Sequence, residues 1–138
     1  MKNILIFLIV ILVTAGSSSA GDWILITNKD NPISSISSAN LKRVYIGKMN
    51  NVDGTTLIPV MLADNIPVTA EFLGEVVGKT PEEYKNYWIE AQIKGEGSAP
   101  MIQKTAVSAK LIVAGIPGAI TYIGKTDLDD SVKQIEIK

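Results

Sequence analysis

The chain has 138 residues with 13 basic and 14 acidic side chains, and it contains neither histidine nor cysteine. That length fits one domain with a sizeable core, and the missing residue types exclude Ser-His-Asp and Cys-His catalysis, the usual zinc sites and disulfides. No basic cluster of the kind seen in nucleic-acid-binding proteins is present. No carboxylate stands in an apolar setting suited to acid–base catalysis. We therefore predict a protein that is not an enzyme, uses no metal or other cofactor and binds no nucleic acid.

The N-terminus has the order of features found in a secretory signal peptide. Lys2 supplies a positive charge, residues 4–13 form an unbroken apolar run, and Ser18 and Ala20 are the small residues that a signal peptidase requires. The alternative is a retained membrane anchor, but the apolar run falls well short of the roughly 20 residues that span a bilayer. We predict cleavage before Gly21.

Cleavage there divides the sequence into a signal peptide, residues 1–20, and a single domain, residues 21–138. No cysteine follows the apolar run, which excludes a bacterial lipid anchor. We expect a soluble product in the periplasm or another extracytoplasmic compartment, without stable membrane insertion.

The first half of the domain alternates strand and helix patterns. Residues 23–27 are a continuous apolar run between turn-forming segments, which predicts a strand buried on both faces. A helix is predicted over residues 38–47, capped by Ser37 or Ser38 and ended by Gly47. Residues 57–62 predict a second buried strand, in which Pro59 indicates an edge position or a bulge.

Two further helices are predicted in the middle of the chain. The first covers residues 67–77, with Asp64 and Asn65 as possible capping residues ahead of it. The second covers residues 81–94 and starts with a capping box formed by Thr80 and Glu83. One face of this second helix carries a stripe of side chains, and its members are Tyr84, Tyr87, Trp88 and Ala91. We interpret this face as part of the core, and the alternative is a platform for a ligand.

The C-terminal part predicts one more helix and two strands. The helix covers residues 105–115, with Val107, Leu111 and Ala114 facing inward. Residues 119–123 form a buried strand, and residues 132–137 alternate as in a half-exposed strand. Strands separated by helices imply crossover connections, hence an α/β fold: a three-layer sandwich of a mixed sheet with helices on both faces.

Three phrases in this order resemble a known family. They are Val44-Tyr45-Ile46-Gly47-Lys48, Ile58-Pro59-Val60 and Pro117-Gly118-Ala119-Ile120-Thr121-Tyr122-Ile123. Together with the helices between them they are similar to one lobe of the phosphate-type (type 2) periplasmic substrate-binding proteins of ABC transporters. The similarity covers nearly all of residues 23–123. It implies a single periplasmic-binding-protein-like lobe.

Members of this family hold an oxyanion between two lobes. After the strand that corresponds to residues 58–62 they present an arginine and then Asp-Gly-Ser-Gly-Thr at a helix N-terminus, where free amides and the helix dipole favour an anion. In this chain Leu62 replaces the arginine, Asp64 and Thr69 match the aspartate and the threonine, and Pro67 offers no amide.

The sequence therefore predicts a ligand-binding site at the starts of two helices. Asp64, Asn65 and Thr69 would line one side, and Lys104 and Thr105 the other. The aspartate would accept a proton-bearing group, the threonines would donate hydroxyls, and the lysine would supply positive charge. The alternative is that these residues only cap their helices.

Two functions stay open. The first is an exported solute-binding-like protein that binds phosphate or another small anion for an ABC transport system, with a transporter as its partner. The second is a non-catalytic interaction or structural module of a cell-envelope assembly that has lost ligand binding. A possible calcium cluster in residues 127–130 lacks the loop glycine and trailing glutamate of such sites, so a solvated turn is the better interpretation.

Overall fold

The computed structural model describes residues 22–138, so the predicted signal peptide lies outside the described part. Within that part no helix combines the length and the apolar character needed to cross a membrane. Residues 22–138 form eight strands, four α-helices, one π-helical turn and one 3-10 turn. In chain order the elements are β1 (Trp23–Thr27), β2 (Ser35–Ile36), α1 (Ser38–Tyr45), β3 (Asn51–Val52), β4 (Thr55–Thr56), β5 (Ile58–Leu62), α2 (Pro67–Phe72), η1 (Leu73–Val77), α3 (Pro81–Ile93), β6 (Met101–Gln103), α4 (Ala106–Gly115), β7 (Ala119–Gly124), η2 (Lys125–Asp127) and β8 (Lys133–Ile137).

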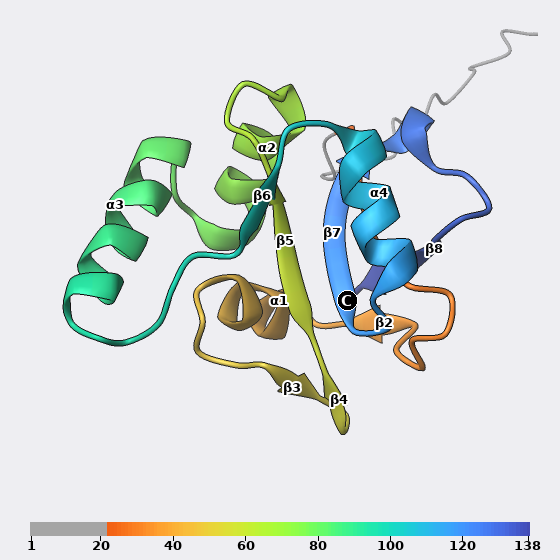
Figure 1. Ribbon diagram of the computed structural model, residues 1–138, viewed down its shortest axis with the longest axis horizontal. Coiled ribbons are helices and arrows are strands. Elements are labelled where there is room, and N and C mark those ends of the chain that lie inside the picture. The colour runs from red at the N-terminus through yellow and green to blue at the C-terminus, as the bar shows by residue number, and fades with distance from the viewer. Residues whose placement is uncertain (1–21) are drawn as a thin grey trace, which may run out of the picture.

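Six strands form one mixed sheet in the order β2-β8-β1-β7-β5-β6, and β3 pairs with β4 in a separate hairpin. Strands β5, β6 and β7 run parallel, whereas β1 runs antiparallel to both neighbours, β7 and β8. Figure 1 shows α4 on one face of the sheet, α1 and α2 on the other, and α3 beside the β6 edge. The predicted α/β sandwich with helices on both faces is confirmed.

The larger core lies on the α1–α2 face and is rich in aromatic rings. Phe72 of α2 stacks on Tyr122 of β7 with ring centroids 4.1 Å apart, and it meets Tyr45 edge-on at 4.7 Å. The smaller core, on the α4 face, gathers Val113 and aliphatic residues of β1 and β7 such as Ile26. Strand β1 is buried along its whole length, as its continuous apolar run predicts.

The helix ends follow the predicted caps in three of four cases. The Ser37 and Thr105 hydroxyls accept from the amides of Asn40 and Ser108, and Thr80 and Glu83 form the predicted capping box. Helix α2 differs, because its N-cap is Ile66, which makes no side-chain hydrogen bond. The predicted capping by Asp64 or Asn65 is therefore wrong. The chain enters this helix through Pro67, whose ring presets the helical φ.

Two further sequence predictions need correction. Strand β5 lies inside the sheet, yet it holds Pro59. The proline is tolerated because pairing with β6 begins only at Val60, so its missing N–H interrupts no ladder bond on that side. Helix α4 was predicted to turn Val107, Leu111 and Ala114 inward. All three are exposed, and Ala109 and Val113 are buried instead.

Candidate functional site

The ends of β5 and β6 place the predicted site residues at one edge of the sheet. The two strands are parallel neighbours, and just beyond them the amide of Ala63 donates to the carbonyl of Gln103 at 2.9 Å. The chain then enters α2 on one side and α4 on the other, so both helices begin at this edge (Figure 1). In open α/β sheets this is where ligands bind, outside the carboxyl ends of the strands.

Asp64 and Asn65 lie on the exposed turn between β5 and α2. Lys104 and Thr105 occupy the corresponding exposed bend between β6 and α4. The Thr105 hydroxyl accepts from the Ser108 amide at 3.0 Å, which is a helix-capping bond. Four of the five predicted residues thus face solvent at the edge where the two helices start.

Thr69 differs from the other predicted residues because it is fully buried. Its hydroxyl contacts the carbonyls of Leu62 and Ala63 at 3.2 and 3.0 Å, and it lies 3.1 Å from the hydroxyl of Tyr122. The amide of Leu62 donates to the same tyrosine at 3.0 Å. The polar groups at the end of β5 are therefore bonded to one another, and Thr69 fastens α2 to the strand.

Tyr122 is the member of this network that the sequence did not reveal. Burial raises the pKa of Tyr122 to about 12, so its hydroxyl stays protonated and serves as both donor and acceptor. Its position inside a predicted buried strand was correct, but unlike the isoleucines beside it the tyrosine brings a hydroxyl into the core. That hydroxyl was the available signal, because a buried tyrosine usually bonds a polar partner.

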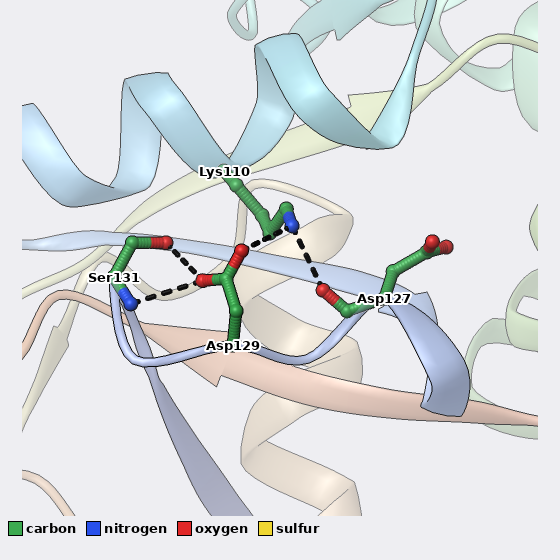
Figure 2. A network of polar contacts seen from close by, with 4 residues as sticks. All are labelled: Lys110, Asp127, Asp129 and Ser131. Atoms are coloured by element: carbon green, nitrogen blue, oxygen red, sulfur yellow. Dashed lines mark hydrogen bonds and ion pairs between the residues drawn. The ribbon is translucent and has the colours of Figure 1, made fainter.

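The acidic stretch that could have suggested calcium binding has a structural role. The carboxylate of Asp129 accepts from the Lys110 ammonium at 2.7 Å and from the backbone amide and hydroxyl of Ser131, as Figure 2 shows. Lys110 also donates to the carbonyl of Asp127 at 2.8 Å. These bonds tie α4 to the loop before β8, and they hold the pKa of Asp129 well below its usual range. Among residues 22–138 no cluster of three or more metal-ligating side chains occurs.

A mixed sheet with two helix starts gathered at the carboxyl ends of parallel strands is the arrangement of an α/β ligand-binding lobe. Scanning the chain against protein-family models gives no match, and searching the curated proteins gives none either.

Solved structures match the fold over most of the chain. A structure described as a candidate phosphate ABC transporter substrate-binding protein with bound phosphate, from Clostridium perfringens, shows a TM-score of 0.65 and 25% identity over 84% of this chain and 44% of its own. An ABC-type phosphate transport receptor from Vibrio cholerae shows a TM-score of 0.66 and 19% identity, over 84% of this chain and 46% of its own. PstS from Borrelia burgdorferi shows a TM-score of 0.61 and 16% identity, over 85% of this chain and 47% of its own. The chain thus resembles one lobe of phosphate-type substrate-binding proteins and spans less than half the length of these structures.

Proposed function

We propose that the protein is an exported solute-binding-like lobe that holds a small anion, such as phosphate, for an ABC transport system. The observation that carries the proposal is the meeting of the α2 and α4 N-termini at the carboxyl ends of β5 and β6. Helix N-termini present free amides and a positive dipole end, which favour an anion. Helix α4 is the main donor of such amides here, because Pro67 of α2 has no N–H and the Thr69 amide donates to the carbonyl of Ile66. Lys104 adds a full positive charge beside the start of α4.

The compared structures support this proposal through their fold and their described ligands. The one from Clostridium perfringens is described with bound phosphate, and the one from Vibrio cholerae is described as a phosphate transport receptor. The signal-peptide pattern of residues 1–20 is consistent with delivery to the periplasm. Proteins of this kind bind their solute without changing it, and the chain has no histidine or cysteine for catalysis. The transporter is the expected protein partner.

Calorimetric titration of the purified protein with inorganic phosphate tests the proposal. We expect saturable binding that Lys104→Ala weakens markedly, because the substitution removes the charge beside the α4 N-terminus. Lys42→Ala is the matched control, since Lys42 is an exposed lysine of α1 away from that edge, and it should leave the affinity unchanged. No heat of binding at millimolar phosphate, or equal effects of the two substitutions, would refute an anion site at this edge.

A second function is favoured because polar groups at the position where the family binds its ligand are bonded to one another in this chain. The Thr69 hydroxyl and the Leu62 amide are both engaged with Tyr122, and Asp64 adds a negative charge nearby. These groups stabilise the lobe itself. The second candidate is therefore a non-catalytic interaction module of a cell-envelope assembly, and absence of phosphate binding in the same titration would favour it.

A further inference from the structure

A groove separates α3 from the edge strand β6. Two cavities open along it, one of about 390 Å³ beside the end of β5 and one of about 550 Å³ beside its start. Trp88, Ala99 and Pro100 line both cavities, so the two are adjoining compartments along the same strand. Figure 1 shows α3 on the same side of the molecule as β6.

The lining of the groove is mostly apolar on both sides, with a few charged side chains, such as Asp64 and Lys85, among its members. On the helix side the lining residues recur every three or four positions along one face of α3, among them Tyr84, Trp88 and Ile89. On the strand side Met61 and Ile102 face them. Among the described residues, eight large apolar side chains are exposed, and four of these line the two cavities: Ile58, Ile89, Met101 and Ile102. Such a concentration marks a binding surface.

The backbone of β6 also has bonding capacity that β5 does not use. The carbonyl of Gln103 accepts from Ala63, so the backbone groups of Gln103 point toward β5. Because successive residues of a strand direct these groups to opposite sides, the N–H and C=O of Ile102 point away from β5, into the groove. Edge strands with such groups are templates for pairing with another strand.

We propose that this groove binds an extended, apolar segment of another polypeptide as an added strand beside β6. The segment would exchange two main-chain hydrogen bonds with Ile102, and its side chains on the groove side would enter the two cavities. This inference does not depend on anion binding, because it uses the side of β6 and not the end of the strand.

The features of the groove favour an extended peptide over other occupants. A helix bonds its own backbone groups internally and would leave those of Ile102 without partners. The opposite sheet edge is only two residues long, Ser35–Ile36, and its isoleucine is buried. Strand β6 carries Met101 and Ile102 on its surface, 48% and 60% exposed, and no charged side chain within its bounds that would discourage pairing.

Selection from a phage-displayed library of random octapeptides against the immobilised protein tests the proposal. Selected peptides should carry apolar residues at alternate positions. Ile102→Pro removes the outward N–H and the isoleucine side chain of the groove lining but no bond to β5, so it should weaken binding of the selected peptides about tenfold while thermal unfolding stays unchanged. Ile102→Ala, which keeps the N–H, should weaken binding less. Ile89→Glu, on the helix side, should weaken binding at least as much.

Leu111→Glu is the matched control for Ile89→Glu, because Leu111 is also an exposed apolar residue but lies on α4, away from the groove. It should leave peptide binding unchanged. The proposal is overturned if no peptide is enriched over the Ile102→Pro protein, or if the selected peptides bind the parent and both groove variants equally. A concentration-dependent dimer that Ile102→Pro abolishes, without any selected peptide, would instead make a second copy of this chain the occupant and would also overturn it.

Discussion

Replacing Trp88 by alanine should lower the free energy of unfolding by about 3 kcal/mol. The indole is 6% exposed and packs edge-on against Tyr84 and Tyr87, with centroids 6.3 and 5.2 Å away. Emptying an aromatic core site costs about 3–5 kcal/mol. The lower end applies because two cavities already adjoin the indole, so fewer packing contacts are lost than at a fully enclosed site.

Helix α3 keeps two other attachments in this variant, which is why unfolding should remain a single transition. The hydroxyls of Tyr84 and Tyr87 donate to the carbonyls of Tyr45 and Ile46 at the end of α1. Urea denaturation followed by far-ultraviolet circular dichroism measures the loss, with an unchanged slope against urea concentration. Ile93→Ala, on the same helix, is the control.

Ile93 is 81% exposed, so its truncation should change stability by less than about 0.5 kcal/mol. A loss below about 1 kcal/mol for Trp88→Ala would contradict the packing argument. It would show that the aromatic face of α3 contributes little to the core and is free for another role.

Three further substitutions test other parts of the fold. Gly118→Ala should cost about 1–3 kcal/mol, because a Cβ there would lie 2.3 Å from the carbonyl oxygen of Thr56 and the backbone would have to move. Thr69→Val should cost about 1–3 kcal/mol by removing the hydroxyl that joins α2 to β5. Lys110→Met should destabilise the protein near neutral pH, and this difference from the parent should shrink in acid as Asp129 protonates, because only the bond to the Asp127 carbonyl then remains.

The acid dependence of the Lys110→Met effect follows from the direction in which the pKa of Asp129 is shifted. The pKa of Asp129 is lowered in the folded protein from its usual value near 3.8, so its bonds with Lys110 and Ser131 stabilise the fold above that value. The stabilisation is lost as pH falls below 3.8 and through the folded pKa. Urea titrations across the acid range check this. A difference that persists unchanged in strong acid would assign the effect to the bond with the Asp127 carbonyl and the packing of the lysine stem, and not to the ion pair with Asp129. For the glycine, Gly115→Ala is the control, since no atom lies within 4 Å of a Cβ there.

The sequence predicted well wherever local patterns are strong. Helix α3 begins at its capping box and Gly47 ends α1 in the left-handed region at φ 75°, because both signals act over a few residues. The sequence did not predict which face of α4 is buried. That helix is apolar nearly all round, so its periodicity does not define an inner face, and contacts with β1 and β7 decide which residues are buried.

Strand β6 was missed for a different reason. It has only three residues and follows Pro100, which gives too short a pattern to separate a strand from a loop. Its existence depends on the neighbouring β5, with which it forms the parallel ladder. The candidate site also depends on a partner that is distant in the sequence. The sequence could place Thr69 near the end of β5, but the partner that engages its hydroxyl, Tyr122, lies 53 residues further along the chain.

The two proposed sites use different parts of the same pair of strands. The anion site uses the strand ends, with Lys104 as the positive charge, whereas the groove uses the side of β6, with Ile102 as the central residue. The two residues are only two positions apart, but the two sites can be tested separately. Lys104→Ala should weaken phosphate binding and leave peptide binding unchanged, and Ile102→Pro should do the reverse. A chain in which one substitution abolished both activities would have a single site, and the division of labour between strand end and strand side would be wrong.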